Sequence, residues 1–327
     1  MRNQYLSEQH DPDLSDQLNE KEKQMETEQK QRVIILGCGY LGYNLYALLK
    51  ETFPTEIWGI DSPYVSKVLD FTEVDAFNPD EMEALDFRDA VIIDAIGLVA
   101  NNAVSENEEM ALDGIAGNYR RLLRTLKRGG AKRFLFFSSG GTVYGNSLKP
   151  ISEESILHPM TLYSRSKTRE EEVIQESDLD YLILRLSNPY GGYQISGKRQ
   201  GVIPILIRKA YQNDPFEMWI DGDSIRDYFY ITDLAQAIRL LIQKEISREI
   251  INVGSGIGTS LNEVIHLVEE TTGHAINIVP KSSDVPVVKA IVLDVSKLER
   301  LTGYQPSVSM QEGIAMENER IRVELGL

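Results

Sequence analysis

A glycine-rich turn between a short apolar segment and a helical segment constrains the fold of this chain more than any other feature. The apolar segment Val33 to Leu36 reads VIIL, and it is followed directly by Gly37-Cys38-Gly39-Tyr40-Leu41-Gly42. The next residues, Tyr43 to Glu51, have helical periodicity. Glycines here let the backbone turn tightly and approach a pyrophosphate, whose charge then meets the partly positive N-terminus of the helix. The pattern predicts a dinucleotide-binding unit of strand, turn and helix.

The alternation of apolar runs and helical stretches continues through the first half of the chain. Nearly continuous apolar strands with helices between them are typical of a parallel sheet that is covered on both faces. We therefore predict a doubly wound α/β domain of the Rossmann type. The expected strands are Val33 to Leu36, Ile57 to Ile60, Val91 to Ala95, Phe134 to Phe137 and Tyr181 to Leu184, and the expected helices are Tyr43 to Glu51, Leu112 to Lys127 and Tyr163 to Glu176.

Beyond residue 186 this alternation ends, and proline and glycine become frequent. Loops of this kind suit a smaller, loop-rich α+β lobe that faces a substrate. We assign residues 32–187 and 227–253 to the dinucleotide-binding domain and residues 188–226 and 254–327 to the second lobe. Residues 1–31 are almost entirely polar and charged, so we expect a flexible leader, with a helical arm for dimer contacts as the alternative.

Composition excludes several classes of partner. The 327 residues carry a formal net charge of −16, and such a surface repels nucleic acid and anionic membranes. The single cysteine, Cys38, excludes an internal disulfide and a cysteine-based metal site, and it suits a reducing compartment. No apolar run reaches the roughly 18 residues that a membrane span needs. We expect a cytoplasmic protein with no bound metal, no nucleic-acid partner and no membrane association.

An acid after the second expected strand indicates which dinucleotide is bound. Asp61 ends the segment EIWGID. A carboxylate at this place accepts hydrogen bonds from the adenosine ribose and repels a 2′-phosphate. Because no arginine follows Asp61, the sequence favours NAD over NADP. The alternative is an ordinary glycine-rich turn with an incidental aspartate.

The motif Tyr163-Ser164-Arg165-Ser166-Lys167 predicts an acid/base pair. A tyrosine and a lysine four residues apart on a helix share a face, so the ammonium lies beside the phenol. A phenol titrates near pH 10, and its use as a base near pH 7 needs roughly 4 kcal/mol of selective phenolate stabilisation. The lysine and a positive nicotinamide ring supply that stabilisation. The alternative is a surface tyrosine with a solvated lysine, and the dinucleotide turn upstream argues against it.

Seven stretches of the chain carry a resemblance to a known family. They read GCGYLG, SSGGTVYG, ISEESILHPMTLYSRSK, LRLSNPYGGYQ, DSIRDYFYITDLAQAI, NVGSGIGTSLNEVI and SSDVPVVKAIVLDVSKLERLTGYQP. Together, from Arg32 to Leu327, they resemble the extended short-chain dehydrogenase/reductases, in particular the NAD-dependent sugar-nucleotide epimerase/dehydratase branch that includes the UDP-glucose 4-epimerases. The resemblance implies NAD in the larger lobe, a nucleotide-diphosphate sugar in the cleft and a homodimer built on helices of the cofactor lobe.

The resemblance also implies roles for single residues beside the cofactor. Asp75 and Ala76 are similar to the pair that contacts adenine, and Ile96 and Gly97 are similar to the loop beside the cofactor. Relatives usually read GxxGxxG in the first turn, whereas Leu36 stands at the first of these positions here.

On the substrate side, the resemblance implies three binding residues. Arg226 matches an arginine that binds the diphosphate, and Lys281 stands where relatives often carry a second arginine. Asn188 matches an asparagine that reaches the substrate near its diphosphate. Such cations meet the two negative charges of a nucleotide diphosphate. The alternative for Arg226 is a surface ion pair with Asp227 or Asp233.

The motif SSGGTVYG lacks the hydroxyl that most relatives carry at its third position, where Gly140 stands. In an extended strand end, Gly140 and Thr142 point to one side, and Ser139 and Gly141 point to the other. We therefore expect Thr142 to supply the catalytic hydroxyl, with Ser139 or a water molecule as alternatives. Relatives also place an asparagine in the helix near Asp113, where it supports the lysine, and this chain lacks it.

The same motif selects a reaction. Related dehydratases and uronate decarboxylases carry an acid at the positions of Gly141 or Thr142. Without that acid, elimination lacks its proton-transfer groups. Epimerisation at C4 needs only Tyr163 as the base and NAD as the hydride carrier. We predict an NAD-dependent nucleotide-sugar epimerase that acts at C4 of a UDP-hexose. The nearest alternative is a nucleotide-sugar 4-ketoreductase, a dehydratase is less favoured, and a noncatalytic NAD-binding protein is a minor alternative.

Overall fold

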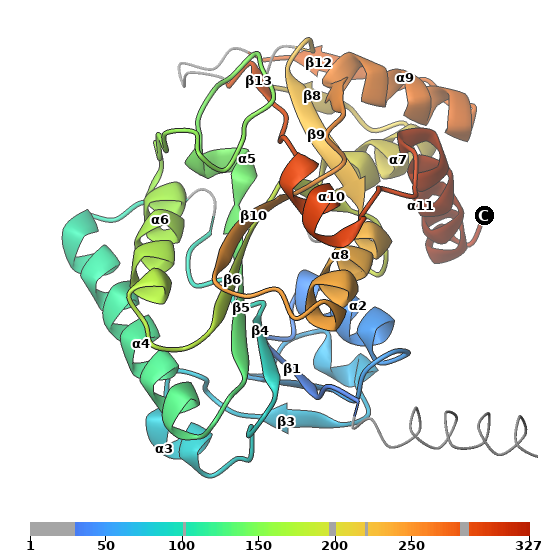
Figure 1. Ribbon diagram of the computed structural model, residues 1–327. Coiled ribbons are helices and arrows are strands. Elements are labelled where there is room, and N and C mark those ends of the chain that lie inside the picture. The colour runs from blue at the N-terminus through green and yellow to red at the C-terminus, as the bar shows by residue number, and fades with distance from the viewer. Residues whose placement is uncertain (1–29, 101–102, 196–200, 220–221, 282–287) are drawn as a thin grey trace, which may run out of the picture.

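The computed structural model describes residues 30–100, 103–195, 201–219, 222–281 and 288–327. The expected leader, residues 1–31, therefore lies outside the described residues except for its last two positions. Figure 1 shows a central sheet with helices on both sides and a second group of strands and helices above its carboxyl edge.

The central sheet has seven strands in the order β10-β6-β5-β4-β1-β2-β3, and every neighbouring pair is parallel. The expected doubly wound fold is confirmed, and two strands, β3 and β10, were missing from the expectation. The strands are β1 (Val33–Leu36), β2 (Thr55–Gly59), β3 (Phe71–Glu73), β4 (Val91–Asp94), β5 (Arg133–Ser139), β6 (Tyr181–Leu186) and β10 (Glu249–Val253).

Successive residues of β1 enter two different cores, because side chains of a strand alternate between its faces. Val33 and Ile35 belong to one buried cluster, and Ile34 and Leu36 belong to the other. The helices α2 (Tyr40–Leu49) and α8 (Ile231–Gln243) cover the first face, and α3 (Pro79–Glu83), α4 (Glu108–Arg128) and α6 (Leu162–Gln175) cover the second. A short 3-10 helix, η1 (Val65–Lys67), follows β2.

Helix α4 begins one turn earlier than its apolar pattern indicates. The side chain of Asn107 accepts a hydrogen bond from the backbone N–H of Met110 at 3.1 Å, and this cap starts the helix at Glu108 rather than Leu112. None of the helices in the described parts of the chain is long and apolar enough to cross a membrane.

Among the described residues, the second lobe contains a four-stranded sheet, a two-stranded sheet and four helices. In the larger of the two sheets, β9 (Ile225–Tyr230) pairs with β7 (Asn188–Tyr190), β11 (Gly258–Ser260) and β13 (Ala290–Ile291). The other elements are β8 (Phe216–Met218), β12 (Ile278–Pro280), α7 (Val202–Gln212), α9 (Leu261–Thr272), α10 (Ser296–Thr302) and α11 (Met310–Leu325).

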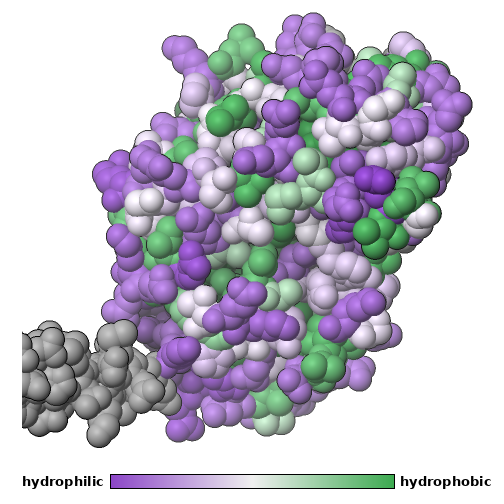
Figure 2. All heavy atoms as spheres, turned by 90° about the vertical axis from the view of Figure 1, so that its right-hand side faces the viewer, coloured by the Kyte–Doolittle hydropathy of each residue, from purple (hydrophilic) through white to green (hydrophobic). Residues whose placement is uncertain are grey.

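The chain crosses between the lobes where β6 leads to β7, where β9 leads to α8 and where β10 leads to β11. Residues 227–230, which the sequence assigned to the dinucleotide-binding domain, therefore belong to a strand of the second lobe. The other domain bounds stay a prediction. Figure 2 shows that the face on the side of α11 is largely hydrophilic, with apolar side chains scattered in small groups, as is usual for a protein surface.

Candidate active site

The glycine turn lies where the carboxyl ends of β1, β2 and β4 meet. Gly37 has φ +97°, a left-handed value that favours glycine, and a Cβ on it would lie 3.0 Å from the carbonyl carbon of Ala95. A Cβ on Gly42 would lie 1.9 Å from the carbonyl oxygen of Gly37. Both positions require glycine because backbone atoms fill the space that a side chain would need. Leu36, which departs from the usual pattern of relatives, is fully buried in β1, so the turn starts at Gly37 instead.

Two other glycines border open space. A Cβ on Gly39 or on Gly97 would have no heavy atom within 4 Å. Gly39 is also the N-cap of α2, and no side chain caps the first turn of that helix. Uncapped N–H groups at a helix N-terminus suit a pyrophosphate. The cradle therefore fits the diphosphate of a dinucleotide such as NAD.

The other expected cofactor residues also lie at the carboxyl ends of the strands. Asp61 follows β2 and is exposed, and Asp75 and Ala76 follow β3. The Asp75 carboxylate accepts a hydrogen bond from the N–H of Phe77 at 2.9 Å, and Ala76 is buried. The hydroxyl of Tyr40 donates to the carbonyl of Gly191 at 2.8 Å and so ties the turn to the second lobe.

A cleft of about 520 Å³ lies between these strand ends and the second lobe. It brings together nine of the residues that the sequence singled out, from both lobes. They are Leu41, Ile96, Gly97, Ser139, Thr142, Tyr163, Lys167, Asn188 and Arg226. Their individual roles stay predictions.

A capping box places the Tyr163 motif at the start of α6. The N–H of Ser164 donates to Thr161 Oγ1 at 3.1 Å, and the N–H of Thr161 donates to Ser164 Oγ at 2.9 Å. Tyr163 therefore lies in the first turn at the cleft, and Lys167 lies one turn further along the same face.

Lys167 is 7% exposed and forms an ion pair inside the protein. Its ammonium donates to Glu170 Oε2 at 2.9 Å and lies 4.4 Å from the ring centroid of Phe136. Burial by itself lowers the pKa of Lys167, but the charges of Glu170, Tyr163 and Asp94 outweigh it and raise the pKa above its usual value. Asp113, near which relatives carry the asparagine, pairs with Arg169 and not with Lys167.

Sequence reasoning missed Asp94, which ends β4 and also lines the cleft. Its carboxylate accepts hydrogen bonds from the hydroxyl of Tyr119 at 2.6 Å and from the N–H of Ile96 at 2.9 Å. Burial raises the pKa of Asp94, although Lys167 and these donors act in the opposite direction. An acid at the end of the apolar run VIID was the available signal, because buried carboxylates are rare without a partner.

The prediction that Gly140 and Thr142 point the same way is wrong. β5 ends at Ser139, and residues Gly140–Val143 form a helical turn, α5, so successive side chains are about 100° apart rather than 180°. A Cβ on Gly140 would lie 2.7 Å from Leu293 Cδ1 and 3.2 Å from the carbonyl oxygen of Arg185. A side chain at position 140 would therefore point into the protein and not into the cleft.

Ser139 and Thr142 remain as hydroxyl candidates on the cleft side. A Cβ on Gly141 would lie 4.0 Å from Ser139 Oγ and 3.8 Å from Asn188 Oδ1, so position 141 borders both side chains. The Thr142 hydroxyl donates to the carbonyl of Ser139 at 3.5 Å.

Two further hydroxyls that sequence reasoning missed also line the cleft. Ser138 and Ser187 are buried, and neither hydroxyl has a hydrogen-bond partner among the described residues. Buried polar groups are normally paired, so two unpaired hydroxyls in one cleft fit a polar ligand.

Arg226 projects from β9 into the cleft without a carboxylate partner among the described residues. Its guanidinium donates to the carbonyl of Ile225 at 2.8 Å. The expected alternative, a pair with Asp227 or Asp233, is not formed, because Asp227 accepts from Ser255 and Asp233 accepts from Ser307. Burial lowers the pKa of Arg226, although Tyr228 acts in the opposite direction.

The other two expected substrate residues differ in position. Asn188 lines the cleft and donates to the carbonyl of Asp227 at 2.9 Å. The ammonium of Lys281 lies 3.4 Å from Glu217 Oε1 and 6.0 Å from the ring of Trp219, and Lys281 is not among the residues that line the cleft. The following residues, 282–287, lie outside the described part of the chain.

Comparison with known proteins identifies the family. A family model described as the NAD-dependent epimerase/dehydratase family matches residues 33–254. The chain belongs to this family. The expected resemblance is thereby confirmed, as are the expected class of enzyme and its dependence on NAD, which this family shares.

Curated relatives in the epimerase/dehydratase family act on different nucleotide sugars, as their names say. A dTDP-4-dehydro-6-deoxyglucose reductase from Escherichia coli is 35% identical over 196 residues, which are 58% of this chain and 62% of the reductase, or less than two thirds of its length. A putative UDP-glucose 4-epimerase from Methanocaldococcus jannaschii is 32% identical over 258 residues, which are 75% of this chain and 81% of that protein.

Solved structures of the family share the fold. A UDP-glucose 4-epimerase from Thermus thermophilus in complex with NAD is similar with a TM-score of 0.78 and 25% identity over 89% of this chain and 99% of that chain. A UDP-glucose 4-epimerase from Thermotoga maritima with UDP-glucose has a TM-score of 0.74 and 26% identity over 90% of this chain and 100% of that chain.

Proposed function

We propose that this protein is an NAD-dependent nucleotide-sugar epimerase that acts at C4 of a UDP-hexose. The observation that carries the proposal is a cleft that holds Tyr163 and Lys167 together with Arg226, beside an open glycine cradle. Arg226 has no carboxylate partner among the residues that the structure describes. Relatives named as UDP-glucose 4-epimerases support the choice of substrate.

In the proposed reaction, Tyr163 accepts the proton of the 4-hydroxyl, and Lys167 stabilises the phenolate while hydride leaves C4. NAD, when bound, supplies reversible hydride transfer. Ser139 or Thr142 donates a hydrogen bond to the oxygen at C4. Arg226 and Asn188 hold the diphosphate, so the 4-keto sugar can rotate and receive hydride on its other face.

The cofactor residues have roles in the same proposal. The turn of Gly37, Gly39 and Gly42 holds the pyrophosphate, with Tyr40 and Leu41 beside it at the start of α2. Asp61 binds the adenosine ribose, Asp75 and Ala76 contact adenine, and Ile96 and Gly97 border the nicotinamide side. The open space at Gly39 and Gly97 supports this arrangement.

The test is to incubate the protein with UDP-, GDP- and dTDP-hexoses without added reductant and to resolve the products. We expect interconversion of one pair of C4 epimers with a UDP-sugar. Tyr163→Phe should lower turnover about 10²- to 10⁴-fold. Tyr181→Phe is the control and should leave turnover unchanged, because Tyr181 lies at the end of β6 that is away from the cleft. Full turnover by Tyr163→Phe would overturn the assignment.

A nucleotide-sugar 4-ketoreductase is the second candidate, because the E. coli relative named as a reductase is 35% identical. It would use the same tyrosine and lysine but consume a reduced dinucleotide. Stoichiometric NADH oxidation with a 4-keto sugar, and no epimer formation without reductant, would select it over the epimerase.

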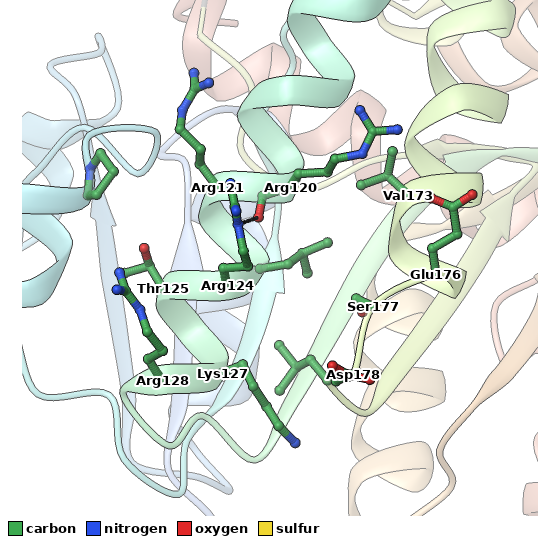
Figure 3. A pocket seen from close by; sticks show the side chains of 13 residues that line it. Arg120, Arg121, Arg124, Thr125, Lys127, Arg128, Val173, Glu176, Ser177 and Asp178 are labelled. Atoms are coloured by element: carbon green, nitrogen blue, oxygen red, sulfur yellow. Dashed lines mark hydrogen bonds between the residues drawn. The ribbon is translucent and has the colours of Figure 1, made fainter.

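We also propose a homodimer that pairs α4 of two copies in antiparallel fashion, in the cytoplasm. Helix α4 begins with Glu108 and Glu109, and its second half carries five cations around a hollow of about 670 Å³ beside α6 (Figure 3). These are Arg120, Arg121, Arg124, Lys127 and Arg128. An antiparallel pair sets the acidic end of one helix beside the basic end of the other.

Light scattering at low and high salt tests this dimer, and cell fractionation tests the compartment. We expect Arg121→Glu with Arg124→Glu to shift the protein to monomer at low salt. A dimer of unchanged stability in that variant would contradict the α4 interface.

A further inference from the structure

Glu170 is the one residue of α6 whose carboxylate is bound to the ammonium of Lys167. Its Oε2 accepts from Lys167 Nζ at 2.9 Å, and the two residues are 1% and 7% exposed. The carboxylate of Glu170 has no other hydrogen bond among the described residues. Removing one member of a buried ion pair leaves the charge of the other uncompensated, so Glu170 bears directly on the charge of Lys167.

A second carboxylate, Asp94, acts on the same ammonium from β4. The groups that face Lys167 are Tyr163 and Glu170 from α6, Asp94 from β4 and the ring of Phe136 from β5. Tyr119 from α4 binds Asp94, and the adjacent Glu171 acts on Glu170. One ammonium thus faces two buried carboxyl groups, and its positive charge is balanced before any ligand enters the cleft.

This balance bears on the acid/base chemistry of Tyr163. A phenolate is stabilised by a nearby positive charge and destabilised by a nearby negative one. A lysine held by a neutral side chain offers its full charge to the phenolate, whereas a lysine held by carboxylates offers much less. Burial strengthens every one of these interactions, because water screens them poorly in the interior.

We propose that Glu170 is a positioning residue that holds the ammonium of Lys167 through their buried ion pair and thereby weakens the support that Lys167 gives to the Tyr163 phenolate. The inference rests on the proposed function for its catalytic meaning only. With the weaker support from Lys167, Tyr163 is a good proton donor to a keto sugar. Proton donation to the keto sugar completes epimerisation, and a ketoreductase also needs this step.

The pH dependence of kcat/KM tests the proposal. In Glu170→Gln, a side chain of nearly the same shape loses its charge, so the phenolate should form more easily. We expect the midpoint of the acidic limb to fall by about one pH unit. An unchanged or raised midpoint would overturn the proposal.

A second measurement needs no substrate and no activity. Tyrosinate absorbance is recorded against pH in the ligand-free protein, and the curve of the Tyr163→Phe variant is subtracted to isolate Tyr163. The same difference in the Glu170→Gln background should have a midpoint lower by about one pH unit. If no sugar is turned over, the proposed function fails, yet this titration still decides the role of Glu170.

Matched variants separate charge from structure. Glu172→Gln removes an acid of the same helix that pairs with Arg169 at the surface, and it should shift neither midpoint. Glu170→Asp keeps the negative charge that Glu170→Gln removes, so its midpoints should lie closer to those of the native protein than to those of Glu170→Gln. A purely steric role of Glu170 would not produce this difference between the two variants. If Glu170→Gln does not fold, Asp94→Asn removes the second charge and should shift both midpoints in the same direction. An unshifted midpoint in that variant would contradict the proposal.

Discussion

Glu170 and Glu171 are neighbours in α6 and are equally buried, yet they lie in very different surroundings. Glu171 accepts three hydrogen bonds from Arg185, at 2.6, 3.0 and 3.3 Å. Glu170 accepts one, from Lys167 at 2.9 Å. Glu171 therefore binds a residue of β6, whereas Glu170 binds Lys167, which lines the cleft.

The difference separates two kinds of buried polar group in the protein, those that are hydrogen-bonded to one another and those that are not. On the side of Glu171, Arg185 donates to the Tyr144 hydroxyl at 2.9 Å, and that hydroxyl donates to Asn252 Oδ1 at 2.8 Å, so the polar groups satisfy one another. On the cleft side, the hydroxyl of Ser138 has no partner among the described residues. A satisfied network stabilises the fold, whereas unsatisfied groups are available to a ligand.

The largest expected effect compares the two glutamates directly. Glu171→Gln leaves the Arg185 guanidinium buried and unbalanced, so we expect the free energy of unfolding to fall by about 3–5 kcal/mol. Glu170→Gln should cost less, roughly 1–3 kcal/mol, because Asp94 still balances Lys167. Urea unfolding at neutral pH measures both values. Equal losses of unfolding free energy in the two variants would contradict the difference between Glu170 and Glu171.

Alkaline pH probes the satisfied side through Tyr144. Burial raises the pKa of Tyr144 to about 12, although Arg185 acts in the opposite direction. Because the unfolded phenol titrates near pH 10, the stabilisation from the protonated tyrosine is complete below pH 10 and is lost between pH 10 and 12, about 3 kcal/mol in all. Tyr144→Phe should therefore lose less stability over that range. If the native protein and Tyr144→Phe lost the same amount of stability between pH 10 and 12, Tyr144 would not be the source of the loss.

Arg226 and Arg185 extend the comparison to cations. Arg185 is paired with Glu171, whereas Arg226 has no carboxylate partner in the described part of the chain. Arg226→Gln should therefore raise the free energy of unfolding of the ligand-free protein, while Arg185→Gln lowers it. The same Arg226 variant should raise KM for the nucleotide sugar roughly 10- to 100-fold with little change in kcat. A lower unfolding free energy together with an unchanged KM would make Arg226 a structural residue.

The smallest expected effect distinguishes the two glycines of the turn after β5. Gly140→Ser forces a side chain against Leu293 and should cost about 1–2 kcal/mol without raising activity. Gly141→Ser has only ordinary contacts, at 3.8 Å or more, and should fold normally. Thermal unfolding measures both. Equal stability of the two variants would show that position 140 is open after all.

Local patterns made most of the fold predictable. The apolar run of β1, the glycines after it and the helical period of α2 all depend on neighbouring residues, so the sequence alone indicated a dinucleotide-binding unit. Tyr163 and Lys167 were predictable for the same reason, because a spacing of four sets two residues on one face of a helix. β3 is only three residues long and half-exposed, and it left no such pattern.

The orientation of the turn after β5 was not predictable in this way. SSGGTVYG suits an extended strand end as well as a helical turn, and packing against Leu293 and Arg185 selects the turn. That choice sends position 140 inward and leaves Ser139 and Thr142 at the cleft.

The sequence by itself determined the parallel sheet, the cofactor turn and the tyrosine and lysine pair, since each follows from the backbone preferences and periodicity of adjacent residues. The tertiary structure alone decided that Glu170 binds Lys167 while Glu171 binds Arg185, and that Asp94 lies beside the first pair. Adjacent residues of a helix point about 100° apart, so their partners come from different elements. Only the packing of α6 against β4, β5 and β6 brings those partners within reach.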